Sequence, residues 1–409
     1  MMSPHRLASV LAVVLGLVVV AVAATASGGS VSRAARTTPV EREISVLYVV
    51  SAGGGTLAPE TGGGYRLRLR GVARQALMFA DRPSRFTSAM PVEGLAASWR
   101  ALGFAKVPPN AALTLLDGRP GRDTILLELT QPRWEPSAGA LSFLARPLDR
   151  PSRNLSHLGR RVTGTLPRAF RTATLFLDDA TGTTVNGCYI GPWTTCDKAS
   201  LQNVDLSGST LTDASFAGAN LSNADLSSAT LTGASFAGAT LTGVRLDHVS
   251  AHSAIFDNAS MESVSANAAD FTGASFNRTD AAEGSYTDAI FGKAALIGGA
   301  SFLGANMSGA SFAGATINAT FATGILRGAD FSGTTADGSG FYQVNAQGAK
   351  FENASLFNIN LTEANVTGAS FRGSDLAWAF FQGATGFDPG TAKLCNTQMP
   401  DGSTANGGC

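Results

Sequence analysis

The chain has 409 residues, enough for two or three domains, and its 30 basic and 30 acidic side chains give a formal net charge of zero. That balance gives no global reason to expect a nucleic acid or an anionic membrane as a partner. Charged residues make up only 15% of the sequence and glycine numbers 47. A composition with few charges and many small residues favours a repeat scaffold over a typical enzyme.

Residues 1–26 have the pattern of a secretory signal peptide. A short polar start containing Arg6 precedes an apolar run, and small-x-small cleavage candidates follow at 21–23 and 24–26. The run over residues 7–24 is near the lower length for a spanning helix, so an uncleaved membrane anchor is the alternative. Both interpretations predict a secreted or extracytoplasmic protein. Residues 27–43 are small and polar, as in a flexible linker.

Residues 44–178 predict a β-rich domain of unknown role, a small β-sandwich or barrel-like fold with one helix. Strands are expected at 44–50, 65–70, 75–80, 112–116, 124–130, 140–145 and 172–178. Turn signals separate them, including glycine triplets at 53–55 and 62–64 that we expect to be turn tips. A helix is expected over 92–104, with its apolar face formed by Val92, Leu95, Trp99 and Leu102. The region resembles no family that we can name.

From Ala199 to about Thr385 a Leu or Phe returns every fifth residue, and an Ala stands two places before most of these central residues. Units such as ADLSS (224–228), ASFAG (234–238) and ADFSG (329–333) resemble those of the pentapeptide-repeat family. The resemblance implies an all-β fold, a right-handed four-sided β-helix with four pentapeptides in each coil.

The sequence supports four units per coil independently. LTDASFAGAN (211–220) and LTGASFAGAT (231–240) agree at eight of ten positions, 20 residues apart. The central residues number 37, a little over nine coils, with one added residue near 297–301 and one missing near 317–321. Taking every fourth central residue gives two core ladders: Phe271, Phe291, Phe312, Phe331, Phe351 and Phe371 in one, and Phe216, Phe236, Phe256 and Phe276 in the other. We expect these side chains to point inward and to stack about 4.8 Å apart.

Both ends of such a solenoid need covering, because open backbone edges recruit other chains. Residues 179–198 contain Cys188 and Cys196 and precede the first coil; residues 386–409 contain Cys395 and Cys409 and follow the last. Nine coils separate the two ends by about 43 Å, whereas the Cα atoms of a disulfide lie within roughly 7 Å. The pairing predicted is therefore Cys188 with Cys196 and Cys395 with Cys409, one disulfide in each cap.

Motifs for chemistry are lacking. His248 and His252 are four apart, but the repeat frame places them on adjacent sides of a coil, which disfavours a metal site. No nucleophile elbow, phosphate-binding loop or dinucleotide fingerprint is present. We therefore expect no catalytic residues, no metal and no cofactor.

Charge is divided unevenly along the neutral chain. Residues 199–385 hold 15 acidic and 6 basic side chains, whereas residues 45–178 hold 9 acidic and 18 basic ones. The β-rich domain thus carries nine excess positive charges and the repeats nine excess negative charges. Ordinary solvation of two surfaces is the first explanation of this division. A more specific one is that the basic domain docks on an anionic wall polymer or lipid surface, or equally on its own acidic repeats.

These observations favour an exported, non-catalytic scaffold or binding protein, with a rigid solenoid and a basic domain for anchoring or recognition. The expected partner is an unknown protein or an envelope polymer. We expect membrane contact only through a retained N-terminal segment, and no nucleic acid. A second hypothesis follows from the resemblance, because some pentapeptide-repeat proteins mimic DNA and bind type II topoisomerases; the acidic repeats agree with it and the signal peptide does not. A third is an enzyme with its site in residues 44–178, around Asp81-Arg82-Pro83 or Trp99-Arg100.

Overall fold

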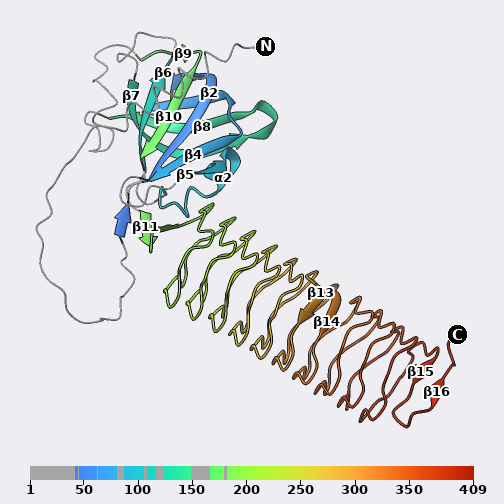
Figure 1. Cartoon of the computed structure of the whole chain (residues 1–409). Helices are drawn as coiled ribbons and strands as arrows, with labels where there is room; N and C mark the ends of the chain where they lie inside the picture. Colours follow the sequence, from blue (N-terminus) through green and yellow to red (C-terminus); the bar gives the residue numbers. More distant parts are fainter. Residues whose placement is uncertain are drawn as a thin grey trace, which may run out of the picture. The chain divides into compact units, whose positions relative to one another are not determined.

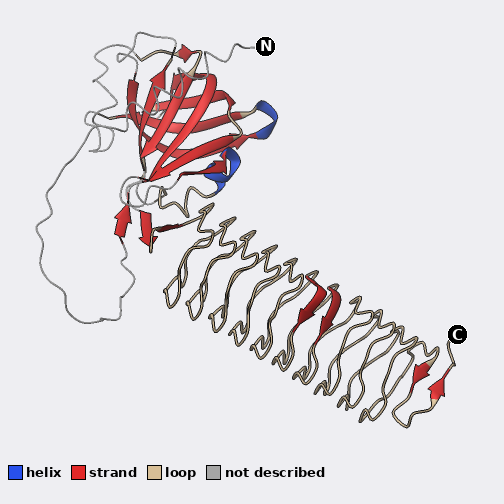
Figure 2. Ribbon diagram, in the orientation of Figure 1, coloured by secondary structure: helices blue, strands red, loops and turns tan. Residues whose placement is uncertain are grey.

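The computed structural model describes residues 42–44, 46–61, 63–80, 87–105, 108–116, 124–148, 166–178 and 182–409. The predicted signal peptide and nearly all of the predicted linker lie outside these residues, as do the turns at 81–84 and 117–123. Within them, no helix has the length and apolar character needed to cross a membrane. The described part is mostly β, with a sheet domain first and the repeats after it (Figures 1 and 2).

The first domain is built around six antiparallel strands that close on themselves in the order β2-β3-β8-β7-β6-β10 and back to β2. β4 and β5 extend the sheet from the first half of β2, and β9 pairs with its second half. The strands are β2 (Val46–Pro59), β3 (Tyr65–Val72), β4 (Gln75–Ala80), β5 (Thr87–Pro91), β6 (Asn110–Leu115), β7 (Thr124–Glu135), β8 (Ala140–Pro147), β9 (Ala169–Phe170) and β10 (Ala173–Asp178).

Alternate residues of these strands fill the inside of the closed sheet, which we call the barrel. Tyr48 on β2, Leu67 on β3 and Phe143 on β8 are fully buried. This is the period of two that a strand with one apolar face requires. The helix is shorter than predicted: α2 covers only Val92–Ala97, and turns follow it. Gly94 within its few residues weakens helix propensity, yet the four apolar side chains expected on one face are all buried.

The expectation that both glycine triplets form turn tips is wrong for the first of them. Gly53, Gly54 and Gly55 lie inside β2. A Cβ on Gly54 would meet the Arg171 carbonyl oxygen at 2.5 Å, and one on Gly55 would meet the Phe170 ring at 2.6 Å. These glycines therefore allow β9 and the chain after it to approach β2 closely. In the second triplet, Gly63 and Gly64 have positive φ in the turn before β3.

The repeats are held together by parallel bridges between residues 20 positions apart, such as Asn220 with Thr240 and Asp330 with Lys350. In each case the bridging residue stands just before a central one. The residue two places after a central one has positive φ in most units and is often Gly or Asn, the residues that tolerate this conformation best. Because each straight segment is so short, most of the repeat region is drawn as loop (Figure 2).

The added and missing residues of the repeat lie beside each other in space. The added one is in β13 (Ala295–Ser301), where Gly298 and Gly299 both have positive φ, and the missing one is in β14 (Thr316–Thr320). These two strands pair in parallel with a shift of register between Leu296 and Ala300. The bridge separation changes to 21 residues from Ile290 to Ser311 and to 19 from Ser311 to Asp330. The two irregularities thus cancel within two successive turns of the chain.

The two ladders expected from the sequence are stacks of buried rings. Their ring centroids are 5.1 to 5.3 Å apart from Phe216 to Phe276, and 4.4 to 5.2 Å apart from Phe271 to Phe371. A third stack was not predicted: Phe302, Phe321 and Phe341 continue one above another at 5.5 and 4.8 Å. Rings of neighbouring stacks meet edge to face, as Phe312 and Phe321 do. Such pairs add roughly 0.5–1.5 kcal/mol each to the burial of the rings.

Short hairpins precede and follow the repeats. β11 (Gly182–Val185) pairs with β12 (Cys188–Ile190) and also with β1 (Arg42–Ile44). At the other end, β15 (Thr397–Gln398) pairs with β16 (Thr404–Ala405). Phe387 lies over the last ladder residues, with its ring 3.8 Å from that of Phe381 and 5.4 Å from that of Phe371.

Candidate binding surfaces

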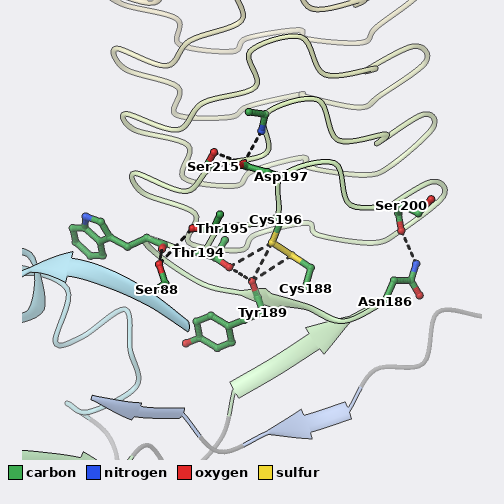
Figure 3. The surroundings of a disulfide bond; sticks show 12 residues. Ser88, Asn186, Cys188, Tyr189, Thr194, Thr195, Cys196, Asp197, Ser200 and Ser215 are labelled. Carbon is green, nitrogen blue, oxygen red and sulfur yellow. Dashed lines mark hydrogen bonds between the residues drawn. A yellow bond between two sulfur atoms is a disulfide. The ribbon is translucent and has the colours of Figure 1, made fainter. Parts of the chain in front are cut away.

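The N-terminal cap carries one disulfide and faces two hydrophobic cores. Cys188 and Cys196 are bonded, with Cα atoms 5.4 Å apart, and both belong to the core of the repeats (Figure 3). Tyr189 and Trp193, which lie between the two cysteines in sequence, pack instead against the core of the barrel. The nine residues from 188 to 196 therefore contact the barrel and the repeats at once.

Polar and steric contacts fix this segment on the barrel. Ser88 on β5 donates a hydrogen bond to the Trp193 carbonyl at 3.2 Å, and its hydroxyl lies 3.4 Å from that of Thr195 (Figure 3). The Trp193 indole rests on α2, where a Cβ on Gly94 would lie 2.5 Å from a ring carbon. Gly94 thus makes room for this ring. Inside the cap, the Thr194 hydroxyl bonds to the Tyr189 carbonyl, which keeps a buried hydroxyl satisfied.

In the C-terminal cap, Cys395 and Cys409 form the second disulfide, with Cα atoms 4.8 Å apart. The cap continues the hydrogen bonding of the last coil, because the amides of Leu376 and Trp378 donate to the carbonyls of Lys393 and Cys395. The buried Thr397 hydroxyl also donates to the Leu376 carbonyl at 2.8 Å. No cysteine in the described part of the chain is free.

Most acidic side chains on the repeats are bonded back to the repeats, in two ways. Carboxylates just before a central residue accept the amide two residues on, as Asp225 does from Ser227 at 2.9 Å. Carboxylates just after a central residue accept from the next coil, as Asp247 does from the Ser265 hydroxyl at 2.7 Å and the Asn267 amide at 2.9 Å. The first arrangement closes a turn; the second joins consecutive coils.

The pKa values of several of these carboxyls follow from this bonding. Burial alone would raise the pKa of Asp247, but the hydrogen bonds from Ser265 and Asn267 and the charge of Arg245 outweigh it and leave the pKa lowered. The same holds for Asp270. Burial acts to raise its pKa, but the hydrogen bonds from Thr272 and His252 outweigh this effect, so the pKa is lowered. Asp213 has burial without such donors, and its pKa is raised.

Comparison with protein families decides the nature of the repeats. The model of the family described as pentapeptide repeats matches in 8 copies, over residues 194–227, 209–247, 317–353, 325–362 and 349–385. The repeat region belongs to the pentapeptide-repeat family. No curated protein matches the chain.

Several solved structures of pentapeptide-repeat proteins are similar to this chain. HetL of the cyanobacterium Nostoc sp. strain PCC 7120, a protein involved in the regulation of heterocyst differentiation, is 22% identical, with 52% of this chain and 92% of that one covered and a TM-score of 0.26. QnrB1, a plasmid-mediated fluoroquinolone resistance protein, is 16% identical over 49% of this chain and 90% of that one, with a TM-score of 0.27. Because these scores are low, the family assignment rests on the matched repeats.

Two columns of charged side chains on the outside of the repeats differ in their contacts. In the first, the Arg245 guanidinium lies 3.0 Å from the Asp225 carboxylate and 3.9 Å from that of Asp247. In the second, the bridge between Asp330 and Lys350 places their backbones side by side. These groups are exposed enough that an ion pair of this kind contributes only about 0–1 kcal/mol.

The two histidines of the pentapeptide repeats do not converge. The His252 ring nitrogen lies 2.7 Å from the Asp270 carboxylate of the next coil, while His248 occupies a positive-φ position two residues after Leu246. Among the described residues, no group of three or more His, Cys, Asp or Glu side chains could hold a metal ion. Of the two clusters considered for an enzyme, Asp81-Arg82-Pro83 lies outside the described residues. Trp99 packs on the rings of Phe104 and Phe143 in the barrel core, at 4.8 and 5.5 Å.

The alternating arginines of β3 lie on the outside of the barrel, and two of the three are paired. Arg66 contacts both carboxylate oxygens of Glu60, at 3.1 and 3.2 Å, and its hydrogen bonds lower the pKa of that carboxyl. Arg68 forms an ion pair with Glu135, and Arg70 is exposed. The run therefore offers less unpaired charge than its sequence suggests.

Some contacts in the structure could not be predicted from the sequence. The sequence indicates a cap over residues 179–198, but it does not show that Tyr189 and Trp193 pack against the barrel core. One signal was available, because two large aromatics between two cysteines exceed what a cap of one small coil can bury. The partner residues Ser88 and Gly94 are about 100 positions away and carry no local signal.

Proposed function

We propose that the protein is an exported, non-catalytic scaffold whose basic barrel attaches a rigid repeat solenoid to the cell envelope. In this proposal residues 199–385 form a right-handed, four-sided β-helix of about nine coils. The observation that carries it is the unbroken stack of rings from Phe271 to Phe371, with a disulfide cap beyond each end of the repeats. A close-packed core of this kind is rigid, so it holds the outer surface of the repeats in one shape.

Family membership supports the non-catalytic part of this proposal, because pentapeptide-repeat proteins are typically binding proteins. The outer carboxylates of the repeats also bond to neighbouring backbone amides and hydroxyls, a structural role that requires no substrate. Export is supported by the signal-peptide pattern of residues 1–26, with retention by residues 7–24 as the variant of the same proposal. Four cysteines in two disulfides agree with an oxidising compartment.

Anchoring is assigned to the barrel on grounds of charge. Residues 45–178 hold twice as many basic as acidic side chains, 18 against 9. Nine of the 18 basic residues lie in segments outside the described residues. Those nine residues and exposed arginines such as Arg70 and Arg74 are the groups that would attract an anionic polymer or surface.

Cell fractionation combined with mass spectrometry of the mature N-terminus tests this proposal. The expected result is protein in the envelope or the medium, with an N-terminus near Ala24 or Ser27 and no free thiol. Envelope-bound protein that still carries residues 1–23 would make it a membrane-tethered scaffold. Cytoplasmic protein with free thiols would overturn export and disulfides together.

The same experiment judges the DNA-mimic hypothesis, which needs the protein in the cytoplasm with a topoisomerase. A direct assay is competition between the purified protein and DNA for a type II topoisomerase. Competition that is lost when acidic residues of one solenoid face are neutralised would support mimicry and contradict the scaffold proposal.

A further inference from the structure

An apolar row crosses the outside of the barrel from strand to strand. Leu77 on β4 stands opposite Val49 on β2, Val49 opposite Phe176 on β10, Phe176 opposite Ala112 on β6, and Ala112 opposite Leu126 on β7. On β2 and β10 the neighbours along the strand are fully buried, so Val49 and Phe176 project from the outer surface. These outer side chains are separate from the barrel core.

The row is open at one end and covered at the other. Ala112 is fully buried and Leu126 is 8% exposed, whereas Leu77 is 46% exposed. At the open end the row widens, because Leu47 and Phe79 are paired with each other one step along the same strands and project to the same side. We call the five residues of this end the outer apolar face; they are Leu47, Val49, Leu77, Phe79 and Phe176.

A cleft with a positive charge adjoins this face. Its volume is about 480 Å³, and it is lined by Val49, Ser51, Ala73, Arg74, Gln75 and Leu77. Arg74 is exposed beside it. On the same side, the row next to the apolar one consists of hydroxyls, since Ser51 is opposite Thr174, Thr174 opposite Thr114, and Thr114 opposite Thr124. Apolar, cationic and hydroxyl groups are therefore neighbours on this side of the barrel.

We propose that the outer apolar face and Arg74 dock the barrel on the surface of a bilayer that contains anionic lipids. Leu77 and its neighbours enter the acyl region, Arg74 meets a lipid phosphate, and the hydroxyl row faces the headgroups. An anionic polysaccharide would match the charge and leave the apolar side chains in water. A second barrel would match the apolar side chains, but two domains with excess positive charge repel each other. The inference rests on the proposed anchoring role and names the surface to which the barrel is anchored.

Vesicle co-sedimentation tests this docking with the chain from Ser27 onward, the form expected after signal cleavage. The described residues begin at Arg42, so this truncation removes none of them. We expect the protein to sediment with vesicles of phosphatidylcholine mixed with phosphatidylglycerol and far less with phosphatidylcholine alone. Leu77→Asp should weaken binding roughly fivefold or more, because a half-exposed leucine no longer enters the acyl region. Arg74→Gln should weaken binding to the mixed vesicles by a similar factor of roughly five.

Matched substitutions on the repeats serve as controls. Ile290→Asp replaces a solenoid side chain of similar exposure, 43%, and Arg327→Gln removes an exposed solenoid charge. Both should bind vesicles like the unchanged protein, and circular dichroism should show that all four variants remain folded. Equal losses for Leu77→Asp and Ile290→Asp would overturn the proposal, as would binding that ignores lipid charge.

The failure of this inference differs from a failure of the anchoring role. Suppose that Leu77→Asp binds isolated cell envelopes and vesicles as well as the unchanged protein does. The barrel then anchors through another surface, and only the assignment of the outer apolar face is wrong. If the unchanged protein binds neither envelopes nor vesicles, anchoring and docking are both wrong. Concentration-dependent dimers that disappear in Leu77→Asp would assign the face to a second copy and contradict the lipid.

Discussion

The barrel and the solenoid bury their cores by opposite means. In the solenoid each ring packs on its equivalent 19 to 21 residues away, so one contact pattern is repeated along the chain. In the barrel the closing contacts join β2 to β10, pairing Ala52 with Ala173, and no pattern repeats. The comparison teaches that stability in the solenoid is divided among coils and their neighbours, whereas the barrel depends on contacts that all form together.

The largest effect that tests this difference should come from a ring in the middle of a ladder. Phe312→Ala removes a fully buried side chain stacked on Phe291 and Phe331 and should cost about 3–5 kcal/mol. Hydrogen exchange read by mass spectrometry should show faster exchange in the adjoining coils and unchanged exchange in the barrel.

Phe380→Ala is the matched control, since this phenylalanine lies in the same repeats and is 38% exposed. It should change stability by at most about 0.5 kcal/mol. If Phe312→Ala accelerated exchange equally in the barrel, the two regions would unfold as one unit and the division proposed above would be wrong.

The next largest effect concerns the disulfides, which affect the two regions unequally. Replacing Cys395 and Cys409 by serine should cost about 2–4 kcal/mol and loosen only the last coils. Replacing Cys188 and Cys196 should cost a similar amount and also raise exchange around Ser88 and α2, because Tyr189 and Trp193 connect this cap to the barrel core. Identical exchange in the barrel for the two double variants would contradict the connecting role of the N-terminal cap.

Gly284→Ala should have an intermediate effect. Alanine is the usual residue at this inner position of the repeat, yet here a Cβ would lie 2.6 Å from the ring of Tyr286. We expect a loss of about 1–3 kcal/mol from overpacking in thermal unfolding. Tyr286→Leu restores the usual central residue, so the double variant should regain most of the loss. Absence of that rescue would show that the glycine serves the backbone and not the ring.

Tyr286 also shows where the sequence alone reaches its limit. The period of five gave the family, the ladders of Phe271 and Phe216, and the caps, because each follows from spacing along the chain. It did not give the third stack of Phe302, Phe321 and Phe341, in which the first two rings are 19 positions apart across the missing residue. Nor did it predict that the Tyr286 ring fills the space that an alanine side chain would take at Gly284, because this packing depends on positions in three dimensions.

In the barrel the local sequence pattern predicted the strands, but it did not predict which strands pair with each other. YRLRLR is β3 with its leucines inside, as its alternation requires. The glycines of β2 resemble a turn in the sequence, because no nearby residue explains why a strand contains them. The cause is the close approach of Phe170, which lies more than 100 residues further along the chain. The outer apolar face escaped notice for the same reason: Leu77, Val49 and Phe176 become neighbours only through strand pairing.

The smallest expected effect is a pH dependence of the solenoid at the acidic end. Asp247 and Asp270 have pKa values lowered from 3.8, so their contribution to stability is complete above that pH. It is lost as the pH falls through their lower folded-state values, because the folded state binds a proton less readily than the unfolded chain. Asp213, with a raised pKa, acts in the opposite sense and reduces the net change. Thermal unfolding between pH 5 and about pH 3 should therefore show a decline that is smaller in Asp247→Asn than in the unchanged protein. An equal decline in both would mean that the bonds from Ser265 and Asn267 do not hold this carboxylate in solution.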